Sequence, residues 1–442
     1  MYDLYPFQQE VVDLTRSGHN VLVVHDCGLG KTITAIEVIK AHKGLRRPAL
    51  VLALKPSFDQ WVEEIQAQDP GASVQIIGRG DSPNQGVDYV ITNLETLLYP
   101  PSLEVLEKTF WSVIVTDEAH RIKNRKAKRS AYVKRLVGHR RLALTGTPME
   151  KSPADMWSIL HWLRPNKYTS YWSFVRAFVQ TDRNWLGKIE FIGPKNLDRL
   201  QEIIKHDVHR YTKEKAAPWL PKVKEYEVHV PMSPGQASLY RKVADSKDIV
   251  VEAGNWRLII PNAMAHIVRL QQLSSHPALL DMRGIPSGKQ EWIKNYIEDN
   301  PDANILVFSR FRGMVMELAR AYNAPCIVGG SDEKVPKGCR LAFGTIGSMG
   351  TALSMGWMDV AIFWDVDRSA TNMSQAKDRI HRLDSTTPKD VIYLSSTGTV
   401  DSLILESVQK KWSDANLVYE FLTRRQYGYD TPPESLLEST ES

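Results

Sequence analysis

The most informative short segment of the sequence places two glycines, a lysine and a threonine directly after an apolar run. The run covers residues 21–24, and Gly28, Gly30, Lys31 and Thr32 follow it. Backbone N–H groups of a glycine-containing turn at the start of a helix point at phosphate oxygens, assisted by the helix dipole. In such a turn Lys31 would reach the β- and γ-phosphates of a nucleotide, and the Thr32 hydroxyl would bind Mg²⁺.

The match is to a relaxed form of this loop. The strict pattern has a glycine five residues before Gly30, where this chain has His25. A chance Lys-Thr after a glycine-rich turn is the alternative interpretation. The order of strand, turn and amphipathic helix favours the phosphate loop.

Two adjacent carboxylates, Asp117 and Glu118, follow the apolar run 113–115. A carboxylate at the end of a buried strand suits a Mg²⁺ ligand in phosphoryl transfer, and Glu118 is placed to polarise the attacking water as general base. The alternative is an acidic pair at a helix N-terminus, which is common. Because the pair follows the phosphate loop at the spacing expected within one sheet, the two motifs together indicate a nucleoside triphosphatase.

A basic segment begins directly after these carboxylates, and residues 121–141 contain ten Lys or Arg and no Asp or Glu. Such a run is often a solvated helix face. A polyanion bound beside the carboxylates would be coupled to hydrolysis, so nucleic-acid binding is an equally good interpretation. The following segment, 144–148, is either a turn with a helix cap or a sensor of the γ-phosphate, and its residue types do not decide between the two.

Three polar residues near the end of the chain, Gln375, Arg379 and Arg382, are spaced i, i+4 and i+7 and are predicted to share one helix face. Two such arginines are often surface ion pairs, but they can also neutralise transition-state charge in phosphoryl transfer. Near the start, Gln8 carries the donor and acceptor groups that an adenine edge requires.

These candidate residues must be positioned by the strands and helices that the rest of the sequence forms. Short runs that are apolar on both faces alternate with amphipathic patterns in both halves of the chain, which is typical of parallel sheets covered by helices. The expected strands are residues 21–24, 49–54, 89–92, 113–115, 142–144, 304–309, 340–343, 360–364 and 391–394, and the expected helices include 32–41 and 59–67.

Composition excludes several classes of protein. With 442 residues, 43% of them hydrophobic and 24% charged, the chain has material for two or three globular domains. Its three cysteines, Cys27, Cys326 and Cys339, form no CxxC pair, which argues against a disulfide framework or a zinc site. No apolar stretch approaches the roughly 18 residues of a membrane span, and no signal peptide is evident. We expect a cytoplasmic or nucleoid-associated protein that is not secreted.

The pattern of alternation is interrupted between the two halves. Aromatic residues gather there, and a Pro-containing stretch follows them at 218–221. We expect a first α/β lobe at 1–165, a helical insertion and connection at 166–222, a second lobe at 223–410 and a polar tail at 411–442. The aromatic residues are Tyr168, Tyr171, Trp172, Phe174, Phe178 and Trp185.

Taken in order, these segments resemble the motor of a superfamily-two helicase, and specifically its Swi/Snf-like branch. The resemblance spans roughly residues 4–408, and segments of the connection and of the second-lobe entry occur in few other helicases. The matching segments are 4–8, 26–32, 49–64, 117–124, 144–163, 220–221, 236–240, 270–277, 287–289, 305–311 and 375–382. The sequence departs from the family pattern at 347–353, 368–370 and 381–384.

The resemblance implies an α/β fold of two RecA-like parallel-sheet lobes, with a helical insertion between them, that close on ATP and Mg²⁺. It implies nucleotide contacts for Gln8, Gly28, Gly30, Lys31, Thr32 and Gln375, and metal contacts for Thr32 and Asp117. It implies catalytic roles for Lys31, Asp117, Glu118, Arg379 and Arg382. Nucleic-acid contacts, mostly to phosphates, are implied for Lys55, Ser57, Arg121, Lys123, Asn124, Ser309, Arg310 and Ser348.

The function expected from this resemblance is that of a monomeric, ATP-dependent DNA helicase or translocase. It would move along duplex DNA and remodel or unwind forked or branched DNA in replication, recombination or repair, as compact enzymes of the branch do, phage-encoded ones included (for which the location is the host cytoplasm). An RNA helicase, suggested by the Asp-Glu-Ala-His tetrad at 117–120, and a motor-type clamp that recycles transcription complexes are the alternatives. For the aromatic cluster, a packed core is favoured over a strand-separating wedge.

Overall fold

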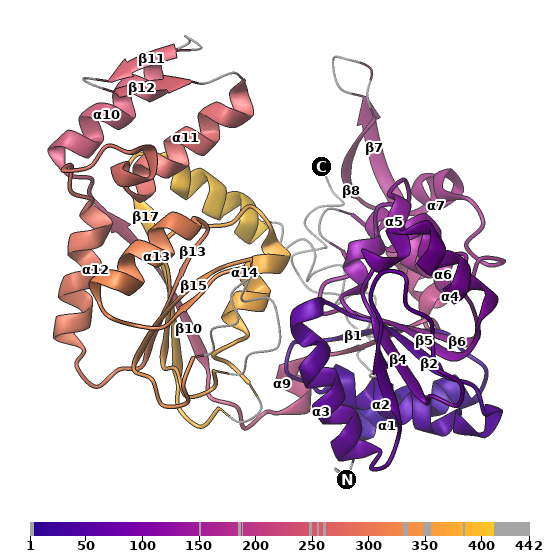
Figure 1. The fold of residues 1–442 in the computed structure, drawn as a ribbon. Coiled ribbons are helices and arrows are strands. Elements are labelled where there is room, and N and C mark those ends of the chain that lie inside the picture. The colour runs from indigo at the N-terminus through magenta and orange to yellow at the C-terminus, as the bar shows by residue number, and fades with distance from the viewer. Residues whose placement is uncertain are drawn as a thin grey trace. The chain divides into compact units, whose positions relative to one another are not determined.

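The chain forms two compact units, one ending at Pro218 and the other spanning Trp219–Lys410 (Figure 1). The computed structural model describes residues 4–149, 152–183, 187, 189–246, 250–253, 256–259, 262–329, 335–347, 355–382 and 385–410. Trp185, Ser348, the tail 411–442 and most of the departures at 347–353 and 381–384 therefore lie outside the described residues.

The first unit is built on a parallel sheet with the strand order β3-β4-β2-β5-β6-β1-β9 (Figure 1). The five strands expected here from apolar runs are all present, whereas β3 and β9 were not expected because they are short and carry polar residues. The strands are β1 Val21–His25, β2 Ala49–Leu52, β3 Val74–Ile76, β4 Tyr89–Thr92, β5 Phe110–Thr116, β6 Val137–Leu144 and β9 Val208–Tyr211.

Helices cover both faces of this sheet, which is why its strands are apolar at consecutive positions. In β1, Val21 and Val23 pack with residues of α1, α2 and α3, whereas Leu22 and Val24 belong to the core on the opposite face. Each such side chain contributes about 1.5–3 kcal/mol when fully buried. The connecting helices are α1 Pro6–Arg16, α2 Lys31–Ala41, α3 Phe58–Gln68, α4 Pro100–Lys108, α5 Lys128–Val133 and α6 Ala154–Leu163, with 3-10 turns η1 Lys43–Leu45, η2 Lys55–Ser57, η3 Thr96–Leu98 and η4 Ala119–Ile122.

The segment that was expected to be a helical insertion and connection contains strands as well as helices. An antiparallel hairpin follows helix α7, the first helix of this segment, and β9 pairs in parallel with β1 at the edge of the first sheet. Tyr168, Phe174 and Phe178 are buried in the core of this unit, as expected of packed aromatic residues. The elements are α7 Tyr171–Phe178, β7 Val179–Arg183, β8 Ile189–Pro194, α8 Leu197–Ile204 and α9 Lys213–Ala216.

The second unit is built on another parallel sheet, with the order β10-β17-β16-β13-β15-β14. The four strands expected here are present. The strands are β10 Val223–Val230, β13 Ile305–Ser309, β14 Cys326–Ile327, β15 Leu341–Thr345, β16 Val360–Phe363 and β17 Lys389–Ser396, with a separate hairpin of β11 Val250–Ala253 and β12 Trp256–Ile259. The helices are α10 Pro234–Asp245, α11 Ala263–Ser275, α12 Gly288–Asp299, α13 Arg312–Ala321 and α14 Ala370–Lys377, with the 3-10 turn η5 Pro277–Leu280. Within the described ranges, no helix is both long and apolar enough to cross a membrane.

A buried ion pair organises the second unit around the start of α12. Lys289 is 1% exposed, and its Nζ donates to Asp401 Oδ2 at 2.7 Å and to the carbonyl oxygen of Trp364 at 2.9 Å. Asp401 also accepts from Ser274 Oγ at 2.7 Å. Beside the lysine, a Cβ on Gly288 would lie 1.9 Å from the carbonyl oxygen of Pro231, so only glycine fits. The Ser-Gly-Lys sequence at 287–289 therefore has a structural reason.

Replacing Lys289 by Met is expected to lower the free energy of unfolding of the second unit by about 3–5 kcal/mol, because it leaves the Asp401 carboxylate buried without its cation. Urea unfolding measures this change. Lys294→Met on the same helix is the control, since the Lys294–Glu298 pair is 3.9 Å apart and more than 60% exposed on both sides. A loss no larger than that of the control would show that the buried pair does not stabilise this unit.

Candidate active site

The order of the parallel strands brings three predicted segments to one edge of the first sheet. Strand β6 lies between β5 and β1, and all three run in the same direction. The segments that leave their carboxyl ends are therefore neighbours: the loop 26–30 after β1, Asp117 and Glu118 after β5, and Thr145 after β6. Ligands of open α/β sheets bind at such carboxyl ends.

The loop after β1 has the backbone of a phosphate-binding turn. Gly28 and Gly30 adopt positive φ angles of 89° and 67°, a region that favours glycine. Helix α2 begins at Lys31 with Gly30 as its N-cap, and no side chain caps its first turn. The Nζ of Lys31 donates to the carbonyl oxygens of His25 at 2.8 Å and Asp26 at 3.1 Å, so the ammonium lies over the loop. Free N–H groups and a cation in one place form an anion site.

Gln8 lies against this loop, but its amide is occupied. Its Nε2 donates to the carbonyl oxygen of Leu29 at 3.1 Å, and its Oε1 accepts from the backbone N–H of Tyr5 at 3.0 Å. A Cβ on Gly30 would come within 2.6 Å of Gln8 Nε2. The structure therefore gives Gln8 the role of a brace for the loop, and the adenine contact stays a prediction.

The carboxylate of Asp117 is half-buried beside Lys31. Its Oδ2 accepts from Trp61 Nε1 at 3.1 Å, and its Oδ1 accepts from the backbone N–H of Glu118 at 2.9 Å. Burial, with the neighbouring Glu118 charge as the next cause, raises the pKa of Asp117 to about 6, and Lys31 is among the groups that oppose this rise. A divalent cation at this carboxylate would hold it ionised, so this pair of adjacent carboxylates fits Mg²⁺.

A short chain of polar contacts joins the carboxylates to the segment after β6. Glu118 Oε2 lies 3.2 Å from His120 Nδ1, and Thr145 Oγ1 lies 3.4 Å from the same ring nitrogen. Next to Thr145, a Cβ on Gly146 would meet Cys27 Sγ and the carbonyl oxygen of His25 at 3.6 Å each. The segment 144–148 thus contacts both the phosphate loop and the carboxylate side, as the sensor interpretation requires.

A histidine pair that the sequence analysis did not find supports the phosphate loop from behind. His25 Nε2 lies 2.9 Å from His209 Nδ1, and His209 Nε2 lies 2.9 Å from Glu10 Oε2. His25 is fully buried, and its Nδ1 has no hydrogen-bond partner among the described residues. Burial, assisted by the charge of His209, holds the pKa of His25 well below its usual range. The only sequence signal was His25 in place of the usual glycine.

The nucleic-acid residues predicted in the first unit differ in accessibility. Lys55 is exposed, whereas the Ser57 hydroxyl is buried and donates to the carbonyl oxygen of Leu54 at 2.7 Å. Arg121 Nη2 donates to Glu95 Oε1 at 3.1 Å. Asn124 is exposed and accepts from the backbone N–H of Lys126, and the half-buried Lys123 lines a surface hollow with it.

In the second unit, the predicted nucleic-acid residues are held by internal contacts. The Ser309 hydroxyl is buried and donates to Asp365, whose pKa is raised to about 6 by burial, an effect that the nearby Lys289 charge opposes. Arg310 Nη1 donates to Gln271 Oε1 at 2.6 Å. These geometries leave the Arg310 assignment open, and the buried Ser309 hydroxyl is a structural contact in this conformation.

The prediction that Gln375, Arg379 and Arg382 share one helix face was wrong. Helix α14 ends at Lys377, and both arginines lie in the turns that follow. Backbone bonds over three residues replace the helical pattern there, because the N–H of Arg379 donates to the carbonyl oxygen of Ala376 at 3.1 Å. Beyond the helix, Ser385 Oγ accepts from the N–H of Arg382 at 2.9 Å and donates to the carbonyl oxygen of Ile380 at 3.0 Å. Gln375 and Arg379 are buried, at 8% and 6% exposed, and Arg382 is half-buried.

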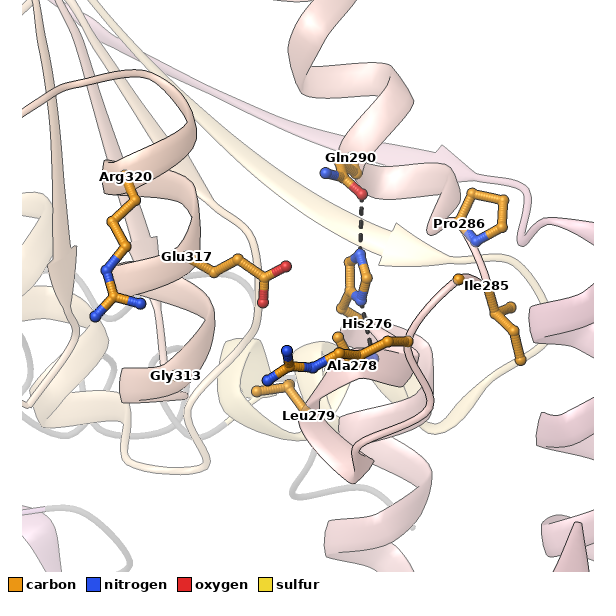
Figure 2. Close-up of a pocket in the computed structure, with 11 residues that line it drawn as sticks. His276, Ala278, Leu279, Ile285, Pro286, Gln290, Gly313, Glu317 and Arg320 are labelled. Atoms are coloured by element: carbon orange, nitrogen blue, oxygen red, sulfur yellow. Dashed lines mark hydrogen bonds between the residues drawn. The ribbon is translucent and has the colours of Figure 1, made fainter. Parts of the chain in front are cut away.

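The second unit also carries a surface hollow of about 750 Å³ that no sequence prediction covered (Figure 2). His276 is fixed at its wall, because Nε2 lies 2.9 Å from Gln290 Oε1 and Nδ1 accepts from the backbone N–H of Ala278 at 3.0 Å. Glu317 and Arg320 of α13 face the same hollow with opposite charges.

Comparisons with known proteins found a family model and several similar sequences and structures. A family model described as SNF2-related domain matches residues 8–279. The chain is 26% identical over 447 residues to the human "SWI/SNF-related matrix-associated actin-dependent regulator of chromatin subfamily A member 1", covering 91% of this chain and 42% of that protein. It is 24% identical over 446 residues to the rice "Probable chromatin-remodeling complex ATPase chain", covering 91% of this chain and 39% of that protein.

A third relative is the Arabidopsis thaliana "Probable ATP-dependent DNA helicase CHR12", which is 26% identical over 467 residues, covering 93% of this chain and 41% of that protein. The chain thus spans less than half the length of these curated relatives. Among solved structures, the Sulfolobus solfataricus SWI2/SNF2 ATPase core in complex with dsDNA is similar with a TM-score of 0.47 and 23% identity, over 97% of this chain and 98% of that chain.

Lowering the pH is expected to destabilise the first unit through His25. The pKa of His25 in the folded chain lies below the usual 6.5. Below pH 6.5, His25 is therefore protonated in the unfolded chain while it stays neutral in the folded chain. Stability is therefore lost as the pH falls, by at most about 1.4 kcal/mol per pH unit for one such group.

Urea unfolding at pH 7.5 and pH 5.5 measures the loss, and His25→Gln should make it smaller. The control is His229, whose side chain is more than half exposed. His229→Gln should lose as much stability between pH 7.5 and pH 5.5 as the wild type. An unchanged loss in His25→Gln would contradict the assignment of a neutral, buried His25.

Proposed function

This chain belongs to the SNF2-related family, since the family domain matches it over residues 8–279, and from that premise we propose that it is an ATP-driven motor that translocates along duplex DNA. The observation that carries the proposal is the meeting of the Lys31 loop with Asp117 and Glu118 at one sheet edge. A cation over a phosphate-type loop beside two carboxylates suits hydrolysis of a nucleoside triphosphate.

ATP is the substrate that we propose for this edge. Lys31 would exchange its two carbonyl contacts for phosphate oxygens, and the uncapped first turn of α2 would add backbone N–H donors. Mg²⁺ held by Thr32 and Asp117 would neutralise phosphate charge. Glu118, oriented by His120 at 3.2 Å, would accept the proton of the attacking water.

Movement would follow from contacts that respond to the phosphates. The segment at Thr145 and Gly146, which follows β6, lies against both the His120 ring and the phosphate loop. Loss of a phosphate at the loop would therefore also change the conformation of this segment. We propose that Arg379 and Arg382 compensate transition-state charge in phosphoryl transfer, a role worth orders of magnitude in rate.

Duplex DNA is the proposed track, bound mainly through its phosphates. One relative is described as a DNA helicase, and the basic segment 121–141 begins directly after the catalytic carboxylates. Phosphate contacts are largely independent of sequence and weaken steeply with salt. We further propose forked or branched DNA as the preferred substrate, a monomeric enzyme, and a location in the cytoplasm or on the nucleoid. RNA remains the alternative substrate to be tested.

Replacing Lys31 by Ala is expected to lower ATP turnover at least about 100-fold, since it removes the cation from the phosphates, while DNA binding at low salt survives. The assay measures phosphate release with duplex, forked and single-stranded DNA and with RNA. Lys108→Ala, at an exposed helix end, is the control and should behave as the wild type.

Wild-type turnover should be stimulated most by DNA that contains a duplex, and more by forked than by blunt DNA. Equal turnover in Lys31→Ala and wild type would remove the assignment of the phosphate loop. Strongest stimulation by RNA would overturn the choice of DNA, and equal stimulation by blunt and forked DNA would overturn only the preference for forks.

A further inference from the structure

A hollow of about 480 Å³ on the first unit combines aromatic and basic groups, and we call it the Trp172 hollow. Its wall is formed by the loop after η4, the start of α6 and the start of α7, and α6 and α7 lie side by side (Figure 1). The side chains that matter for its chemistry are Lys123, Arg125, Lys126, Asp155, Tyr171 and Trp172.

The charge of the Trp172 hollow is strongly positive. Lys123, Arg125 and Lys126 contribute three cations, and Asp155 contributes the one carboxylate of its wall. Lys134 lies nearby, and burial, together with the charge of Arg125, lowers its pKa to about 8. Three cations against one carboxylate in the wall favour a polyanion as occupant.

The aromatic groups of the hollow are held in fixed positions. The Tyr171 ring carries the Arg125 guanidinium 4.4 Å from its centroid. It also meets the rings of Trp157 and Trp172 edge-on, with centroid distances of 5.5 and 5.1 Å. Such packing locks the start of α7, so Trp172 is presented by a rigid support.

Trp172 itself is 44% exposed, unlike most of the aromatic segment to which it belongs. Phe174 and Phe178 turn into the core, because α7 buries one face and leaves Trp172 and Arg176 on the other. A single exposed apolar residue needs no explanation. An exposed tryptophan at the rim of a hollow with three cations is the combination that proteins use to bind unpaired nucleotides, where bases stack on rings and phosphates meet Lys and Arg.

We propose that the Trp172 hollow binds an unpaired nucleotide of a DNA strand, with its base stacked on Trp172 and its phosphates at Lys123 and Lys126. The base must be unpaired because the bases of a duplex are stacked on one another and present only their edges. The hollow of Figure 2 gets no such assignment, since its wall carries the Glu317 carboxylate as well as Arg320 and its described part holds no Phe, Tyr or Trp. This inference rests on the proposed function and deepens it: a motor with such a site would engage the single-stranded arm of a fork.

Dissociation constants for three ligands test the proposal: a blunt duplex, a single-stranded oligonucleotide, and the same duplex with a single-stranded arm. Trp172→Ala should weaken binding of the single strand and the armed duplex by about 5- to 150-fold, the range for loss of one stacked base. Binding of the blunt duplex should stay within about twofold. Trp172→Phe keeps a ring and should retain most of the affinity, and Trp219→Ala, at a tryptophan 63% exposed in the second unit, should match the wild type.

A fluorescent base analogue in the arm adds a readout that a purely structural role of Trp172 would not move. Its emission should be quenched by stacking in the complex with the wild type and restored in Trp172→Ala at saturating protein. Equal affinities of wild type and Trp172→Ala for all three ligands, or a loss that includes the blunt duplex equally, would overturn the proposal. Failure of the wild type to bind any of the three DNAs would instead overturn the proposed function.

Discussion

One geometric constraint positions the candidate site, namely that β6 separates β5 from β1 in a sheet whose strands all run the same way. This order brings a lysine and a pair of carboxylates, which are 86 residues apart or more in the chain, to one edge. The Lys31 ammonium then lies close enough to Asp117 to oppose the rise in pKa that burial imposes on that acid. Opposite charges held at one sheet edge, with free N–H groups beside them, are what a nucleotide phosphate requires.

Buried polar contacts keep this edge in place. Trp61 holds the Asp117 carboxylate, Gln8 braces the loop at Leu29, and His25 backs it through His209. The second unit uses the same means at Lys289, whose ammonium is shared between Asp401 and a backbone carbonyl. Each of these contacts joins a polar group to a specific partner, and this restricts the conformation of the loops.

The sequence predicted what depends on local pattern. Strands such as β1 and β5 were found because residues buried on both faces form continuous apolar runs, and the loop at Gly28 and Gly30 was found because its backbone needs glycine. The sequence did not predict the features that depend on contacts with residues far away in the chain. The polar strand β9 forms because β1 offers it an edge, and the chain that follows α14 is held in turns by Ser385 and by the ring of His381, which lies 3.0 Å from the carbonyl oxygen of Pro221. No spacing rule shows that the Gln8 amide is already bonded.

Calorimetric titration of the protein with ATP, with and without Mg²⁺, tests the central claim most directly when wild type and Asp117→Asn are compared. If Asp117 and the Lys31 loop form one site, Mg²⁺ should strengthen ATP binding to the wild type by at least about tenfold, and Asp117→Asn should bind ATP with little dependence on Mg²⁺. The same dependence on Mg²⁺ in both proteins would show that the carboxylate and the phosphate loop do not act on one ligand, and would contradict the account.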